Sequence, residues 1–430
     1  MFNTSRRRSF FAVGAMALAG AMALGGCAAT EEAAPKSSFD PNAKATLSFV
    51  WWGNDDRAAR YDEAIKAFNE EFPNITVNGT FTDFPSFWEK RQTEAAGGAL
   101  PDVMQFDYSK VRQYGDNGLL LDLTPFFGNE IKTDGFEKDT LALGQLDKAN
   151  YAISTGSNAW ALFQNLDLLT KVGAEPYPGG GTWKELNEYL GSVTEKGGGV
   201  YGGTDYTQRI QNFELTLRQN GKELFEDDGS VGFTEKDLKS FWQSGSDLRD
   251  GVAVPQQKLE EINPVSGFGG NLTTSEFTWS NFLGGLYADS GVQKISLVAP
   301  PTDKPAANDL YLKPTLMHSI AKNTKHPEAA AVFVNFLINS PKVGAIFEDS
   351  RGIPSSETVR EGAALSGNAA DVEKYLDSIK DRLGAAPSLP GENYGSLEQT
   401  FWDLGKSLGL KAVTVDDAVK QFFDEVSALG

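Results

Sequence analysis

Residues that could carry out covalent chemistry are scarce in this chain. There are two histidines, His318 and His326, and one cysteine, Cys27, so we expect no disulfide, thiolate cluster or histidine-rich metal site. A phosphate-binding loop is missing, because Thr400 stands where Gly405-Lys406-Ser407 would need a preceding glycine. No Gly-x-Ser-x-Gly elbow occurs. We therefore expect no catalytic residues, no metal and no cofactor, although 58 acidic residues leave a glycosidase carboxylate pair open.

Aromatic and acidic residues are abundant instead. The chain holds 28 Phe, 12 Tyr and 8 Trp, and its formal net charge is −19. That charge argues against a nucleic-acid partner, because Lys and Arg drive binding to phosphate backbones. A length of 430 residues predicts two or three domains, and 40% apolar with 23% charged residues is typical of a globular protein.

The N-terminus has the pattern of an export signal. Arg6, Arg7 and Arg8 precede an apolar run over residues 10–24, which is shorter than the roughly 20 residues that cross a bilayer. Leu24-Gly25-Gly26-Cys27 resembles the lipobox of bacterial lipoproteins. We expect residues 1–26 to be a signal peptide, Cys27 to be lipidated, and 27–43 to be a flexible tether. Sec and twin-arginine export both stay open.

Strand and helix patterns alternate in the segment that follows. Strands are predicted at Ala45–Trp52, 75–81 and 103–106, and helices from Asp55 and over 87–96. This alternation predicts a parallel α/β sheet, and ligands lie beyond the carboxyl ends of such strands. Trp52, Asn54, Asp107 and Tyr108 follow strand ends and are therefore candidate binding residues.

Several segments along the chain resemble family 1 extracellular solute-binding proteins, the sugar-binding lipoproteins of bacterial ABC importers, which are maltose-binding-protein-like. The segments are Trp51-Trp52-Gly53, Leu100-Pro101-Asp102-Val103-Met104, the run 160–169, Thr182-Trp183-Lys184-Glu185-Leu186, Trp279-Ser280-Asn281, the run 320–330 and Arg351-Gly352-Ile353-Pro354. This chain departs from relatives at Phe163-Gln164-Asn165-Leu166-Asp167, where Tyr-Asn-Lys-Asp is common, so a binding role for those positions is in doubt.

The resemblance implies an α/β fold of the two-lobed, type II periplasmic-binding-protein-like kind, with hinge strands and a ligand cleft between the lobes. It implies chain crossings near Ile153–Asn158, Ile295–Val298 and Ser350–Gly352. The expected first lobe is 44–155 plus 297–350, and the second is 156–296 plus 351–430.

The candidate residues suit a sugar, because aromatic faces cover the C–H faces of a pyranose while carboxylates, amides and guanidinium groups bind its hydroxyls. Trp52 and Trp279 are the expected stacking residues, whereas Trp51 faces the opposite side of its strand and is expected in the core. The expected ligand-binding residues are Trp52, Asn54, Asp107, Tyr108, Trp279, Arg351, Gly352 and Trp402, the last stacking a second or third sugar unit.

The resemblance also implies the partners. A monomer, anchored by lipid on Cys27 to the outer face of the cell membrane, would close on a carbohydrate and deliver it to ABC importer permease subunits. A binding protein for glycerol phosphate or a polyamine is the nearest alternative. A glycoside hydrolase and a structural envelope protein are the others. Neutral and uronate-bearing sugars both stay open.

Overall fold

The computed structural model describes residues 39–136, 138–391 and 393–429, which belong to one compact unit. The expected signal peptide at 1–26 and the expected lipidation residue Cys27 lie outside the described residues, as does most of the expected tether at 27–43.

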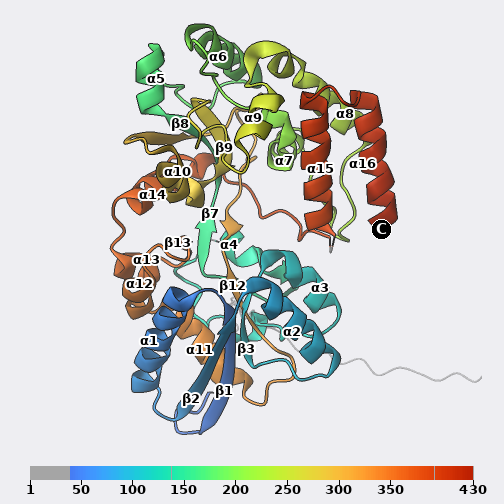
Figure 1. Cartoon of the computed structure of the whole chain (residues 1–430). Coiled ribbons are helices and arrows are strands. Elements are labelled where there is room, and N and C mark those ends of the chain that lie inside the picture. The colour runs from blue at the N-terminus through green and yellow to red at the C-terminus, as the bar shows by residue number, and fades with distance from the viewer. Residues whose placement is uncertain (1–38, 137, 392, 430) are drawn as a thin grey trace, which may run out of the picture. The chain divides into compact units, whose positions relative to one another are not determined.

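The first sheet is built from the alternating strands and helices that the sequence predicts. Its order is β2-β1-β3-β12-β6, with β1–β3 parallel. The bounds are β1 Ala45–Trp52, β2 Ile75–Thr82, β3 Val103–Phe106, β6 Ile153–Ser154 and β12 Met317–Ile320, with helices α1 Asp55–Glu71 and α2 Phe84–Ala96. Figure 1 shows α1 and α2 on opposite sides of this sheet. α2 begins at Phe84 rather than at the predicted residue 87, because the Asp83 side chain accepts from the Ser86 N–H and caps the helix.

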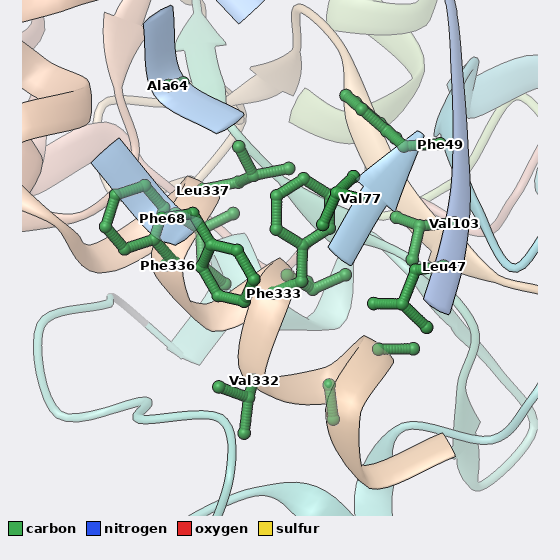
Figure 2. Close-up of a cluster of buried hydrophobic side chains, with 14 of the residues drawn as sticks. Leu47, Phe49, Ala64, Phe68, Val77, Val103, Val332, Phe333, Phe336 and Leu337 are labelled. Carbon is green, nitrogen blue, oxygen red and sulfur yellow. The ribbon is translucent and has the colours of Figure 1, made fainter. Parts of the chain in front are cut away.

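A dense apolar core joins one face of this sheet to α11 (Pro327–Asn339). Figure 2 shows Phe333 and Phe336 of α11 among Phe68 of α1 and Phe49 of β1. The Phe333 ring lies 5.3 Å from Phe49 and 4.9 Å from Phe68, centroid to centroid. Burying each such side chain contributes about 1.5–3 kcal/mol, so this face stabilises the fold.

The second sheet is antiparallel and has the order β10-β8-β9. Its strands are β8 Trp160–Asn165, β9 Ser275–Trp279 and β10 Ile295–Val298, and α6 (Trp183–Lys196) and α14 (Asn368–Ser378) contribute buried residues to the core around it. A capping box begins α6: the Thr182 N–H donates to Glu185 at 2.7 Å, and the Glu185 N–H donates to the Thr182 hydroxyl at 3.2 Å.

A helical layer packs through aromatic side chains. It consists of α7 Ile210–Gln219, α8 Glu235–Ser244, α15 Tyr394–Gly409 and α16 Val415–Leu429. Phe213, Trp242, Phe401 and Phe422 are its largest buried residues, and the Trp242 and Phe401 centroids are 5.0 Å apart. Thr414 caps α16, because the Asp417 N–H donates to the Thr414 hydroxyl.

A small connecting sheet links the two larger sheets along the chain. It has the order β11-β7-β13, from β7 Gly156–Asn158, β11 Lys313–Pro314 and β13 Ile353–Pro354. The chain passes from β6 through β7 into β8, and it returns from β10 through β11 to β12.

The segment Ile295–Val298, where a crossing was expected, forms β10 of the second sheet. β10 pairs with β8 along its whole length, so these residues belong inside the second sheet. Beyond β10, Asp309 is held by the Arg382 guanidinium at 2.6 Å and by the Gln219 amide at 2.8 Å. These contacts tie residues 299–312 to α7 and to the helical turn at Lys380–Arg382. We therefore propose that the first lobe resumes near Lys313 rather than at residue 297.

The remaining elements are short. They are α3 Val111–Asp116, α4 Lys138–Ala142, β4 Gln145–Leu146, β5 Ala149–Asn150, α5 Leu166–Val172, α9 Gln256–Ile262, α10 Leu283–Ser290, α12 Pro341–Phe347 and α13 Glu357–Ala363. Single helical turns are η1 Tyr108–Lys110, η2 Thr124–Phe126, η3 Tyr206–Gln208, η4 Leu248–Val252, η5 Ser280–Phe282 and η6 Lys380–Arg382. In the described part of the chain, no single helix is long and apolar enough to cross a membrane, although α11 and α12 pass that test when counted together.

Candidate ligand-binding site

A cavity of about 220 Å³ lies where the ends of several strands meet. Asp107 and Tyr108 reach it from the end of β3, Asn158 from β7, Trp279 from β9 and Lys313 from β11. Asn281, Pro390 and Tyr394 are among the other residues that line it. The first, second and connecting sheets therefore all contribute polar or aromatic side chains to one space. Three of the residues predicted from the sequence, Asp107, Tyr108 and Trp279, line this cavity.

Trp279 is half-buried at the end of β9, and its ring has neighbours on several sides. The Trp160 ring meets it edge to face at 5.1 Å, and the Tyr311 ring does so at 6.0 Å. The Lys313 ammonium nitrogen lies over the indole, 4.7 Å from the ring centroid. An ammonium at this distance makes a cation–π interaction. Trp279 therefore faces the cavity, but a positive charge already covers part of its ring.

The loop after β3 is rigidly held. The Asp107 carboxylate accepts hydrogen bonds from the Ser109 N–H at 2.9 Å and from the Ser109 hydroxyl at 2.6 Å, so it caps the turn that follows. The Tyr108 hydroxyl donates to the Pro387 carbonyl at 3.3 Å, and burial raises the pKa of Tyr108. The Asp107 carboxylate therefore stabilises this turn, and Asp107 also lines the cavity.

A strap over residues 385–391 contributes Pro390 to the cavity lining. Arg112 of α3 donates to the Leu389 carbonyl from Nε at 3.2 Å and from Nη2 at 3.0 Å. The Leu389 side chain is 3% exposed and packs in the core cluster around Trp88 of α2. This strap precedes α15, so its anchorage on α2 and α3 holds Pro390 and Tyr394 at the cavity.

A buried carboxyl group lies behind Trp279. Glu214 of α7 is 7% exposed and accepts a hydrogen bond from the Tyr311 hydroxyl at 2.9 Å. Burial raises the pKa of Glu214 to about 7, although the Arg218 guanidinium opposes this shift. Tyr311 in turn contacts the edge of Trp279. The indole is therefore supported by a hydrogen-bonded acid whose charge changes near neutral pH.

Trp52 and Asn54 are not among the described residues that line this cavity. Trp52 is 9% exposed and packs against Phe84, Phe87 and Trp88 of α2 at centroid distances of 5.3, 5.1 and 6.0 Å. Asn54 is exposed and caps α1, accepting from the Arg57 N–H at 3.0 Å. Both side chains carry structural contacts. Trp51 is 1% exposed, which confirms the prediction that it belongs to the core.

Arg351 points into the first core, away from the cavity. It is 5% exposed, and its guanidinium carbon lies 3.8 Å from the Phe347 ring centroid and 6.0 Å from that of Tyr61. Gly352 lines a neighbouring space of about 130 Å³ that shares Asn158 and Asn281 with the first cavity. Its φ of +82° and the 2.4 Å that a Cβ would have to Thr315 explain why a glycine is needed.

Trp402 lines a separate cavity of about 280 Å³. Its ring is covered by the Arg209 guanidinium carbon at 3.9 Å, and Arg209 also pairs with Glu276 at 3.0 Å. Tyr394 and Trp402 lie two helical turns apart on α15, so one face of that helix reaches both cavities.

Among the described residues, no group of three His, Cys, Asp or Glu side chains could hold a metal ion. The polar side chains that line the cavity instead carry amides, phenols, the hydroxyls of Ser109 and Thr315, one indole, one ammonium and one carboxylate. Groups of these kinds can bind a polar ligand by hydrogen bonds and ring contacts.

Comparison with known proteins decides the family. The sequence profile of the bacterial extracellular solute-binding proteins matches residues 52–342. The chain belongs to this family. The maltodextrin-binding protein of Bacillus subtilis is 22% identical over 412 residues, which cover 90% of this chain and 92% of the relative.

Solved structures of relatives share the fold. A family 1 extracellular solute-binding protein from Alicyclobacillus acidocaldarius is 28% identical, with a TM-score of 0.77 over 91% of this chain and 99% of the other. A periplasmic oligogalacturonide-binding protein from Yersinia enterocolitica is 20% identical, with a TM-score of 0.76 over 89% and 98% of the two chains. The expected two-lobed, type II periplasmic-binding-protein-like fold is confirmed.

Sequence reasoning missed several residues of this solute-binding protein's cavity. Asn158, Lys313 and Tyr394 line it, and Tyr311 and Glu214 support it from behind. Lys313 and Tyr311 lie in a segment without helical or strand periodicity, so no local signal singles them out. Asn281 could have been found, because it belongs to the segment Trp279-Ser280-Asn281 that carried the family resemblance.

A larger groove of about 910 Å³ lies among α6, α7 and α8 of this solute-binding protein. Trp183, Tyr206 and Phe241 give it an apolar floor, and Glu188 and Asp247 are among the charged residues at its walls. Its described lining residues all lie between Trp183 and Asp303, in the part of the chain that holds the second sheet and its helices. We favour the smaller cavity, because residues from all three sheets converge there.

Proposed function

We propose that this solute-binding protein captures an oligosaccharide outside the cell membrane and delivers it, chemically unchanged, to the permease of an ABC importer. One observation carries the proposal: Tyr108, Asn158, Trp279 and Asn281 converge on one cavity from three different sheets. The curated maltodextrin-binding relative supports a carbohydrate as the ligand class.

The cavity has the two kinds of surface that a pyranose needs. The rings of Trp279 and Tyr108 offer apolar faces for C–H groups, and the amides of Asn158 and Asn281 both donate and accept hydrogen bonds with hydroxyls. A ligand that contacts the first and second sheets together stabilises the arrangement in which both reach it. This differential affinity is the source of the expected lobe closure.

The residues predicted to bind the ligand have three different roles in this proposal: contact with the first sugar unit, contact with a more distant unit, or no ligand contact. Asp107, Tyr108 and Trp279 contact the first sugar unit, and Gly352 borders the adjoining space. Trp402 remains a candidate for a more distant unit, reached along α15. We assign no ligand contact to Trp52, Asn54 or Arg351, because their side chains are engaged in capping or packing.

We further propose that Cys27 becomes the lipid-linked first residue of the exported protein. The apolar run before it and the small residues beside it support this step. Acyl chains hold a protein to a membrane by about 0.8 kcal/mol per buried CH₂ group. A lipid-anchored monomer on the outer face of the membrane would then present its ligand to the importer.

The alternatives from other ligand classes have different requirements. A polyamine site needs several convergent carboxylates, and Asp107 is the one carboxylate among the described residues that line the cavity. A phosphate site needs cationic groups or helix N-termini, and here Lys313 favours glycerol phosphate as the second candidate.

A thermal-shift screen separates these classes. Oligosaccharides, glycerol 3-phosphate and spermidine are each added to the protein, and the melting temperature is followed. A ligand at 100 times its dissociation constant stabilises the folded state by about 2.7 kcal/mol, so a bound oligosaccharide raises the melting temperature. The proposal fails if only glycerol 3-phosphate or spermidine does so, or if the added oligosaccharide is cleaved during incubation.

A further inference from the structure

The charge inside the cavity contrasts with the charge of the whole protein. The chain carries 58 acidic and 39 basic residues, yet the cavity lining includes the ammonium of Lys313. Among the described residues, no ion pair or hydrogen bond of this ammonium is found, and its contact is the Trp279 ring at 4.7 Å. Asp107 is the one carboxylate among the described residues that line this cavity, and it makes no ion pair with Lys313, so the ammonium is available to an anion.

The negative groups near Lys313 are already engaged. Asp107 shares the cavity, but its carboxylate accepts two hydrogen bonds from Ser109. Glu214 lies behind Tyr311, and burial raises its pKa to about 7, so below that pH it is mostly neutral. Among the described residues, no ion pair joins Lys313 to either group, although the charge of Lys313 acts to lower the pKa of Glu214.

The position of the ammonium also restricts what can stack on the indole. A sugar ring that approaches this face of Trp279 meets the Lys313 nitrogen first. A neutral sugar would have to displace the ammonium and lose its cation–π interaction. A sugar that carries a carboxylate would instead give the ammonium a partner, since charge-assisted hydrogen bonds are stronger than those between neutral groups.

A second polar group borders the same space. Asn158 is 6% exposed and lines the cavity, and its amide oxygen accepts no hydrogen bond from the described residues. An amide next to an ammonium can serve the hydroxyl groups that flank a sugar carboxylate.

We propose that the ligand is an acidic oligosaccharide, one that contains a uronic acid, and that Lys313 pairs with its carboxylate at the Trp279 ring. This inference rests on the proposed function and narrows its ligand class. Lys313 is a specificity-determining residue on this account, because it favours the acidic sugar over the neutral one of the same shape.

The test is a calorimetric comparison of matched sugars. Uronate-bearing di- and trisaccharides, digalacturonic acid among them, are titrated beside neutral counterparts that carry CH₂OH in place of the carboxylate. We expect the acidic sugar to bind at least tenfold more tightly. Lys313→Gln should remove this preference, and Lys313→Arg should keep most of it. Circular dichroism and the melting temperature show whether each variant is folded.

Lys258→Gln is the matched control, because Lys258 also lies over an aromatic ring, that of Tyr201 at 5.7 Å, but does not line the cavity. Its preference for acidic sugars should equal that of the wild type. Equal or tighter binding of the neutral sugars would overturn the inference and leave the proposed function standing. So would an unchanged preference in Lys313→Gln. Failure of every carbohydrate to bind, with or without binding of glycerol 3-phosphate, would overturn both.

Discussion

Two tryptophans end strands in this protein, and their surroundings give them different tasks. Trp52 closes β1 and is 9% exposed beneath three aromatic residues of α2, at distances of 5.1 to 6.0 Å. Trp279 closes β9, is half-buried and lines the cavity with Lys313 over its ring. The position at a strand end is the same in both cases. The segments packed against it, α2 for Trp52 and the segment with Tyr311 and Lys313 for Trp279, decide whether the indole becomes core or binding surface.

The contrast extends to the electrostatics of the two regions. Of the rings around Trp52, those of Phe87 and Trp88 belong with it to one core cluster, and that of Phe84 covers them from the surface. Behind Trp279, the chain places Tyr311 and the buried carboxyl group of Glu214. The first region therefore stabilises the fold in a pH-independent way, whereas the second combines ring contacts with a group that titrates.

The largest expected effect is on stability, at Trp52. Trp52→Ala should lower the free energy of unfolding by about 3–5 kcal/mol, because it leaves a cavity among Phe84, Phe87 and Trp88. Urea unfolding measures this loss. Ligand affinity of the folded variant should stay within a few-fold of the wild type. If Trp52→Ala had wild-type stability but no longer bound the ligand, Trp52 would be a binding residue rather than a core residue, and the comparison would be wrong.

The next largest effect is a pH dependence of the free energy of unfolding, and its source is Glu214, near Trp279. The pKa of Glu214 rises from its ordinary value of 4.5 to about 7 on folding. Between those values the folded state binds more protons than the unfolded state, so the free energy of unfolding falls as the pH rises. The fall is complete just above pH 7 and amounts to about 3 kcal/mol, at roughly 1.4 kcal/mol per tenfold change in proton affinity.

Glu214→Gln lacks this titration and should show a flatter pH profile. Urea unfolding of the wild type and the variant between pH 4.5 and pH 8 gives the difference. The exposed Glu188, whose side chain is 65% accessible, supplies the control variant Glu188→Gln, which should keep the wild-type profile. Parallel profiles for wild type and Glu214→Gln would show that the acid behind Trp279 has no raised pKa.

Local patterns predicted the elements better than they predicted the site. The stripe of Tyr61, Ile65 and Phe68 has helical spacing, and α1 buries all three residues. Asp107 and Tyr108 were predicted because they follow a strand of the parallel sheet, where such positions meet at one edge, and Trp279 was predicted from the segment that carried the family resemblance. Trp52 follows the same rule but is covered by α2, which belongs to a later segment of the chain.

Long-range contacts account for what the sequence did not reveal. Arg351 was expected in the cleft, but Phe347, four residues earlier at the end of α12, places a ring beneath its guanidinium. Lys313 and Tyr311 have no periodic pattern, and their role depends on β11 pairing with β7. Likewise, our proposal that the chain crosses near Lys313 rather than at Ile295–Val298 depends on the pairing of β10 with β8. Pairing partners far apart in sequence decide each of these cases.

The smallest of these effects tests the central claim most directly, which is that a ligand contacts Trp279. Isothermal titration calorimetry of Trp279→Ala, with the oligosaccharide that stabilises the wild type, should show a loss of about 2 kcal/mol, or roughly 30-fold in dissociation constant. Trp279→Phe should retain part of the affinity, and the melting temperature without ligand should change far less than that of Trp52→Ala. Wild-type affinity in a folded Trp279→Ala variant would contradict the account.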